Sequence, residues 1–253
     1  MPSLSTYTNG AVYAVNASVK ARRSLTASMA RLSTGIRTFN GADPAGQAVA
    51  SNITTQARSA NVAARNAEDG ISTLQAAEGV LLELATLNTR LRELAIQKLN
   101  SDFLSEAQEN ALTTEENQIV AAAEKISEST LNDRELLSPF LLAINNRGSL
   151  SLMGPVKKPV LQSGVSNVDT QMANISMALG QVAAGINALK GHQSNMYSLT
   201  ANARAAASRI QDTDFAKESA TLAQSSILNQ SALAMVAQAN NAMGNLLTLL
   251  QSY

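Results

Sequence analysis

The chain has 253 residues, with 19 Lys and Arg balanced by 19 Asp and Glu, no Cys or Trp, and only 3% aromatic residues. Balanced charge gives no electrostatic case for binding nucleic acid or anionic lipid, and the absence of Cys excludes disulfides and thiol chemistry. A core so poor in aromatic residues must be built from small and aliphatic side chains on closely approaching helices.

The first predicted element is a helix at the amino-terminal end, where residues 1–19 carry no charge. An apolar stripe at helical spacing runs along it. Its members are Val12, Val15, Val19, Leu25, Met29, Leu32 and Ile36. Because chain ends are normally solvated and polar, a charge-free amphipathic end indicates burial against other protein.

A cluster of helix-breaking residues follows at 38–46 and is predicted to join two regions of the chain. Within it, Asp43 is placed to cap the next helix and Pro44 to begin it. The glycine spacing matches neither the dinucleotide-binding pattern nor the phosphate loop, and no strand precedes it.

Residues 45–100 predict one long rod helix with an apolar seam in steps of three and four. The seam consists of Ile53, Ala60, Ala63, Ala67, Leu74, Ala77, Leu81, Leu84, Leu91 and Ala95. Gly70 and Gly79 mark bends or close contacts in this helix. Ser105 to Gln108 has the form of a capping box and begins a shorter helix.

The pattern changes between residues 131 and 165, where a strand, a turn and a second strand are predicted. The strands are Phe140–Ile144 and Ser149–Leu152, with the turn at 145–148 and Pro139, Pro155 and Pro159 around them. This hairpin is the one β element predicted for the chain.

The next predicted helix carries the longest seam, whose strict spacing favours a left-handed supercoil with a partner helix. The seam runs through Val168, Met172, Ile175, Leu179, Val182, Ile186, Leu189, Gln193, Met196, Thr200, Ala203, Ala207 and Ile210. Asp212 and Asp214 are then placed to cap the last helix.

The last predicted helix lies in a segment, residues 219–253, that has no charged residue but many Gln and Asn. One heptad stripe consists of Leu228, Ala232, Met235, Ala239, Ala242, Leu246 and Leu249, and a second of Leu233, Val236, Met243, Leu247 and Leu250. The scattered polar residues argue against a membrane span. A plain core helix of a compact globule is the alternative, but two charge-free chain ends favour burial against each other and against other copies.

The expected fold class is therefore mainly α: an elongated bundle of long coiled-coil helices with a small β-hairpin region and with the N- and C-terminal helices paired. Chemistry is not expected, because His192 has no partner at ligand spacing and Asp212 and Asp214 lack the rest of a calcium loop. The cluster of Arg90, Arg92 and Glu93 is read as a solvated helix face. No enzyme activity, metal or cofactor is predicted.

Seven ordered motifs resemble those of bacterial flagellins. They are Arg31–Arg37, Asp43–Ala48, Arg65–Ile71 and Leu91–Gln97 in the amino-terminal part, and Ser208–Phe215, Ala237–Asn240 and Leu246–Leu250 in the carboxy-terminal part. The resemblance implies an inner filament-core domain of residues 1–42 and 214–253. It also implies an outer helical rod domain of residues 43–213, with the hairpin near 138–165.

The resemblance further implies a structural subunit that self-assembles into the flagellar filament for motility. Its implied partners are other flagellin subunits, the flagellar export apparatus, a secretion chaperone, and the filament cap and junction proteins. No cleavable signal pattern opens the chain, so extracellular location on the flagellum by export without a cleaved signal peptide is expected. Neither nucleic acid nor a membrane span is expected.

An innate-immune receptor of vertebrates is a further implied partner, through an epitope matched by Arg90, Arg92, Glu93, Leu94 and Gln97. Leu179 and Ala188 stand where flagellins commonly carry arginine, and they are expected opposite this epitope. Leu131-Asn132-Asp133 replaces the family's usual Phe-Asn-Gly, which makes the turn there less certain. The variable outer domain is absent, so the chain resembles a short flagellin.

The alternative is a hook-filament junction protein, a relative whose amino-terminal half is also similar and in which Asp43-Pro44 is at home. The ending Leu246–Leu250 and the Gln-Ala-Asn motif at 238–240 fit flagellin better. An enzyme-bearing flagellin would need an inserted catalytic domain, for which this sequence has no room.

Overall fold

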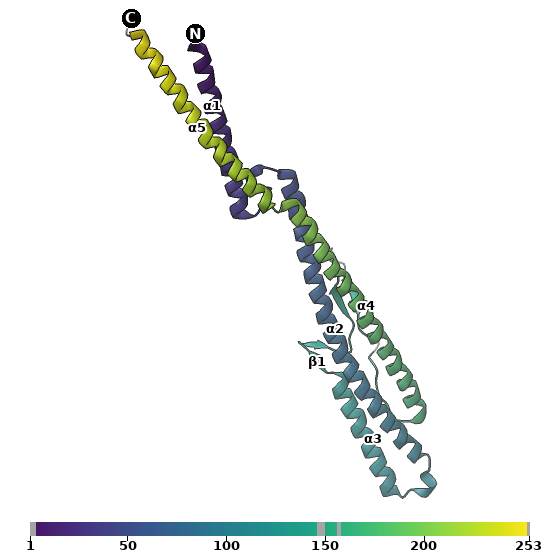
Figure 1. Ribbon diagram of the computed structural model, residues 1–253. Helices are drawn as coiled ribbons and strands as arrows, with labels where there is room; N and C mark the ends of the chain where they lie inside the picture. Colours follow the sequence, from purple (N-terminus) through teal and green to yellow (C-terminus); the bar gives the residue numbers. More distant parts are fainter. Residues whose placement is uncertain (1–3, 146–149, 156–157, 252–253) are drawn as a thin grey trace. The chain divides into compact units, whose positions relative to one another are not determined.

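A computed structural model describes residues 4–145, 150–155 and 158–251 and confirms the mainly α prediction (Figure 1). The helices are α1 (Leu4–Thr34), α2 (Pro44–Lys98), α3 (Glu106–Ser127), α4 (Val165–Gln211) and α5 (Phe215–Gln251), with short 3-10 turns η1 (Phe39–Gly41) and η2 (Ser101–Phe103). The strands are β1 (Thr130–Leu131), β2 (Arg134–Glu135), β3 (Phe140–Ala143) and β4 (Leu150–Met153).

The chain divides into two compact units, residues 1–54 with 204–253 (the terminal unit) and residues 55–203 (the central unit). The division lies inside α2 and α4, so the first turns of α2 and the last turns of α4 belong to the terminal unit. Ile36 pairs with Asp212 in an isolated antiparallel bridge, and the backbone N–H of Arg37 donates to the carbonyl of Gln211 at 2.7 Å. The domain boundaries implied at 42 and 214 stay a prediction.

The core of the central unit joins the predicted seams of α2 and α4 with side chains from α3 and the β3–β4 hairpin, among them Ala123, Phe140 and Met153. Its fully buried side chains include Leu74, Leu81, Leu84, Leu91, Val168, Ile175, Val182 and Leu189. The seam also contains a polar residue that its spacing did not predict: Asn88 is completely buried, and its Nδ2 donates to the carbonyl of Val168 at 3.0 Å. Within the described chain, Oδ1 of Asn88 has no hydrogen-bond partner.

Side chains satisfy the free backbone groups at three helix starts, as predicted. Asp43 Oδ1 accepts the N–H of Gly46 at 2.8 Å, and the Ser105–Gln108 capping box is present. Asp214 Oδ1 accepts the N–H groups of Ala216 and Lys217 at 3.0 and 3.1 Å. The cap predicted for Asp212 is wrong, because this residue forms the bridge with Ile36 and hydrogen-bonds Ser208 instead.

The predicted hairpin is formed by β3 and β4, which are antiparallel with Phe140 opposite Met153. β3 ends one residue before the predicted strand does, and β4 begins one residue after its predicted start. Turn residues 146–149 lie outside the described part of the chain. Gly70 is a close contact to this hairpin, since a Cβ there would lie 2.6 Å from Cδ2 of Leu142. A Cβ added at Gly79 would have no neighbouring side chain within 4 Å.

A second hairpin corrects the prediction of a single β element. β1 and β2 pair antiparallel with Leu131 opposite Arg134. Asn132 and Asp133 form the turn with φ values of 54° and 61°, the positive values that a two-residue type I′ turn requires. Asn and Asp tolerate this region better than other side chains do, so the Asn-Asp dipeptide was the signal that could have predicted the turn.

Candidate functional site

The two terminal helices α1 and α5 lie side by side within the terminal unit (Figure 1). Small side chains fill the seam between them. The buried small residues are Ser18, Ala21 and Ser28 on α1, and Ser225 and Ala232 on α5. Because these side chains are short, the two helices approach closely but bury little apolar surface against each other.

Polar contacts tie the same two helices together. The Ser18 hydroxyl lies 2.9 Å from Asn229 Oδ1, and the Ser225 hydroxyl donates to Ser24 Oγ at 2.9 Å. Near the other end, Arg31 pairs with the largely buried Glu218 at 3.5 Å. These contacts set the register of the pair, while none of them adds apolar burial.

The apolar stripe predicted on α1 is divided between two environments. Val12 and Met29 are 58% and 53% exposed, and Val15 and Val19 are exposed as well. The half-buried members are Leu25, Leu32 and Ile36. Most of the bulky side chains on α1 therefore point away from α5.

The first stripe predicted on α5 is divided in the same way. Met235 and Leu228 are 64% and 52% exposed, whereas Ala232 between them is buried. Leu246 is half-buried, and the side chain of Leu249 lies outside the described part. Ile227 and Tyr13, which no stripe included, are also exposed.

Exposed apolar side chains thus remain on both helices after they have paired. Soluble monomers rarely expose large contiguous apolar surfaces, and such surfaces usually mark contacts with other protein. Faces of this kind on both partners of a helix pair can receive further helices on more than one side. The arrangement is suited to association rather than to chemistry.

The predicted receptor epitope lies on α2 in the central unit and is mostly engaged in ion pairs. Arg90 contacts Glu115 at 2.6 Å and Glu93 at 2.9 Å, and these carboxylates raise the pKa of Arg90. Arg92 pairs with Asp169 at 2.9 Å. Leu94 is fully buried in the core, so its side chain is not part of a surface.

Leu179 and Ala188 do not lie opposite this cluster, which corrects the expected placement. Beside Arg92, the residue contributed by α4 is Asp169. Leu189, the neighbour of Ala188, lies beside Gly70 instead, since a Cβ on Gly70 would be 3.0 Å from its side chain. Gly70 precedes Arg90 by twenty positions, which corresponds to about 30 Å along a helix. Leu179 packs against the central core instead.

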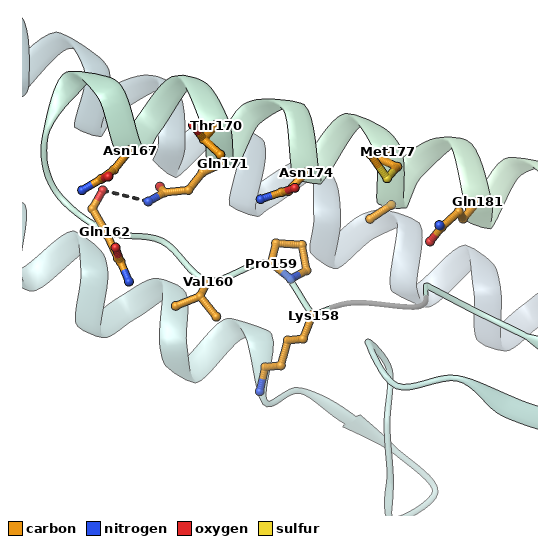
Figure 2. A pocket seen from close by; sticks show the side chains of 11 residues that line it. Lys158, Pro159, Val160, Gln162, Asn167, Thr170, Gln171, Asn174, Met177 and Gln181 are labelled. Atoms are coloured by element: carbon orange, nitrogen blue, oxygen red, sulfur yellow. Dashed lines mark hydrogen bonds between the residues drawn. The ribbon is translucent and has the colours of Figure 1, made fainter.

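A cavity of about 490 Å³ opens between the start of α4 and the segment 158–162 (Figure 2). Carboxamide groups dominate its lining, and Gln171 Nε2 donates to the carbonyl of Gln162 at 3.1 Å. Among the described residues that line it, Lys158 is the one with an ionisable side chain. A general acid–base pair needs two titratable groups, so this lining does not provide one.

The other residues weighed for chemistry are not assembled into a site. His192 is exposed on α4. Among the described residues, no group of three or more His, Cys, Asp or Glu is placed to hold a metal ion. No helix in the described ranges is long and apolar enough to cross a membrane.

Comparison with known proteins identifies the family of this helix pair. Residues 7–139 match the bacterial flagellin N-terminal helical region, and residues 165–250 match the bacterial flagellin C-terminal helical region. The chain belongs to the bacterial flagellin family. The two matches contain nearly all of α1 and α5, and the β3–β4 hairpin lies between the two matches.

Relatives of this flagellin extend over most of its length. A flagellin of Halalkalibacterium halodurans is 33% identical over 88% of this chain and 90% of its own. The flagellar filament core protein FlaB2 of Brachyspira hyodysenteriae is 30% identical over 96% and 99%. A flagellin of Bacillus subtilis is 28% identical over 88% and 91%. Because these relatives are named flagellins or a filament core protein, they do not favour the alternative of a hook-filament junction protein.

Proposed function

We propose that this flagellin assembles through the apolar faces that α1 and α5 leave exposed, each being covered by neighbouring subunits. The chain is a structural subunit of the bacterial flagellar filament. The observation that carries the proposal is the exposure of Val12, Met29, Leu228 and Met235 on helices that are already paired. Because each of these side chains is already about half covered, burying the rest would contribute about 1 kcal/mol per side chain to assembly.

The test is seeded filament growth of a Met235→Asp variant. Met235 is exposed in the single chain, so the new carboxylate costs little there, but covering it with a neighbouring subunit would bury an unpaired charge. We expect growth to stop while the helical content of the monomer stays the same. Met235→Leu is the matched control and should elongate filaments. Normal growth of Met235→Asp would refute the proposed role of this face.

We also propose the finer partners and location that the family implies. These are the export apparatus, a secretion chaperone, and the filament cap and junction proteins, with the assembled protein outside the cell. Catalytic activity is not part of the proposal, and flagellins are a family of structural proteins. Turnover that survives repurification and disappears in His192→Ala would contradict this part.

For the vertebrate receptor, we propose a surface of Arg90, Arg92, Glu93 and Gln97 without Leu94. Gln97 is exposed, whereas Leu94 is fully buried. Because both arginines already hold carboxylates, a receptor must compete with these ion pairs, and we expect weak stimulation by the monomer. A reporter-cell response as strong as that of a potent flagellin would contradict the expectation.

A further inference from the structure

A groove of about 610 Å³ lies in the terminal unit on the side of α1 that faces away from α5. Val19, Ala27, Ala30 and Phe39 supply apolar lining, and Phe39 comes from the turn η1. Val19 and Phe39 are 43% and 41% exposed. The groove therefore has apolar walls that nothing in the described single chain covers.

Three arginines also line the groove, and two of them are available to a ligand. Arg31 is held by Glu218. Arg22 and Arg23 are exposed, and in the described chain neither guanidinium has a hydrogen bond or an ion pair. An apolar groove with two unpaired guanidinium groups fits a partner that presents an apolar side chain next to carboxylates.

The central unit carries a surface of that description at the connection between α2 and α3, which we call the tip. Phe103 is 90% exposed and Leu99 is 73% exposed. Asp102 and Glu106 flank Phe103, are exposed, and have carboxylates without an ion pair in the part of the chain that the structure describes. The tip thus combines an exposed apolar side chain with unpaired carboxylates, the two features that fit the groove.

The charges of the two units are opposite. The segments 1–54 and 204–253 contain eight Lys and Arg against four Asp and Glu, whereas residues 55–203 contain eleven against fifteen. Copies of this chain therefore attract each other most strongly when the terminal unit of one approaches the central unit of another. A contact between two different surfaces leaves both available for the next copy, which is the geometry of an open polymer.

We propose that the tip of one copy docks in the groove of a second copy, with Phe103 on the apolar walls and Asp102 and Glu106 facing Arg22 and Arg23. This inference rests on the proposed function, since it names one contact within the filament. It is independent of the apolar faces on α5, which the Met235→Asp variant tests.

The first test reverses the charges of the groove, of the tip, and of both together. The measurement is the rate of seeded filament growth. Arg22→Glu with Arg23→Glu should slow growth by about tenfold or more, and so should Asp102→Lys with Glu106→Lys, because like charges then meet. The variant with all four changes restores opposite charges and should regain most of the rate. All four positions are exposed, so folding of the monomer should not change.

The outcomes separate this proposal from the proposed function. If wild type does not elongate filaments, the proposed function fails. If wild type grows and the reversed variants grow equally fast, the docking is wrong while the filament function stands. If both reversed variants are slow and the fourfold variant is no faster, the two surfaces do not face each other and the docking is again wrong.

Cross-linking gives a second measurement, helped by the absence of native Cys. Filaments grown from an equal mixture of Ala27→Cys and Leu99→Cys subunits with different tags should form a mixed disulfide dimer on oxidation. Leu82→Cys is the matched control, since Leu82 is an exposed leucine of the central unit outside the tip. Absence of the mixed dimer, or an equal yield with Leu82→Cys, would overturn the proposal.

Discussion

The hydroxyl of Ser18 on α1 donates a hydrogen bond of 2.9 Å to Oδ1 of Asn229 on α5, which joins residues 211 positions apart. Ser18 is buried in a seam of small side chains, so few other contacts compensate for its loss. We therefore expect Ser18→Ala to lower the free energy that holds the helix pair together by about 1 kcal/mol.

The measurement for this first prediction is the temperature at which filaments depolymerise. Ser18→Ala should lower it, and Asn229→Ala combined with Ser18→Ala should cost less than the sum of the two single changes. Ser33→Ala is the control, because the exposed Ser33 hydroxyl bonds only to the carbonyl of Ala30 in its own helix. Strictly additive losses would show that the hydrogen bond contributes no coupling.

A second prediction concerns the two glycines of α2. Gly79→Ala should stabilise the chain by up to about 1 kcal/mol, because Ala favours the helix and the Cβ meets open space. Gly70→Ala should be less stable than Gly79→Ala by about 1 kcal/mol or more, because its Cβ would lie 2.6 Å from Leu142 and 3.0 Å from Leu189. Urea unfolding of the two variants decides this. Equal stability would mean that the hairpin adjusts freely.

The third prediction tests the buried amide of Asn88. Asn88→Asp replaces the donor to Val168 with a buried carboxylate, which we expect to cost about 3 kcal/mol at pH 7. Burial disfavours the charged form, so the stability should recover as the pH falls and the new carboxyl takes up a proton. Asn88→Leu, a seam residue of similar size, is the control and should be tolerated. A loss independent of pH would exclude charge burial as the cause.

The fourth prediction follows from Glu68, which accepts hydrogen bonds from the Tyr197 hydroxyl at 2.7 Å and from Gln193 at 2.8 Å. These donors, Tyr197 first, lower the pKa of Glu68 below its ordinary value. A lowered folded-state pKa gives stability above the ordinary carboxyl range that is lost as the pH falls through the folded pKa.

Tyr197→Phe removes the larger contribution, so its thermal midpoint should fall less than that of wild type between neutral and acid pH. At the alkaline end the sign reverses: Glu68 raises the pKa of Tyr197, and this contribution is lost as the pH rises through the folded pKa of the phenol. The effect is small because both groups are exposed to solvent. If the thermal midpoints of wild type and Tyr197→Phe fall by the same amount between neutral and acid pH, the account is contradicted.

The long helices could be predicted because heptad spacing and caps specify them locally. Leu74, Leu81 and Val182 have the predicted burial, and Asp43 and Asp214 cap as expected. Asn88 was missed because the predicted seam passes from Leu84 to Leu91, seven residues later, and does not include the position between them. The β1–β2 hairpin was missed because Asn132 and Asp133 adopt positive φ without the glycine that usually signals it.

The interaction surfaces could be predicted only in part. Charge-free ends indicated association, but α5 has several apolar faces, and its sequence alone does not determine which of them meets α1. The seam turned out to use the small residues Ser18, Ala21 and Ala232. The groove beside Phe39 and the exposed Phe103 depend on how two short turns fold, and no periodic pattern predicts the direction of a turn side chain.

Hydrogen exchange of the backbone amides of α1 and α5, in the monomer and in the filament, tests the central claim most directly. The small seam supplies little apolar burial, while ordering each residue costs about 1 to 2 kcal/mol, so we expect fast exchange in the monomer. Neighbouring subunits should cover Met29, Leu228 and Met235 in the filament, and exchange should then become slow along both helices. Equally slow exchange in the monomer, or fast exchange of either helix in the filament, would contradict assembly through these faces.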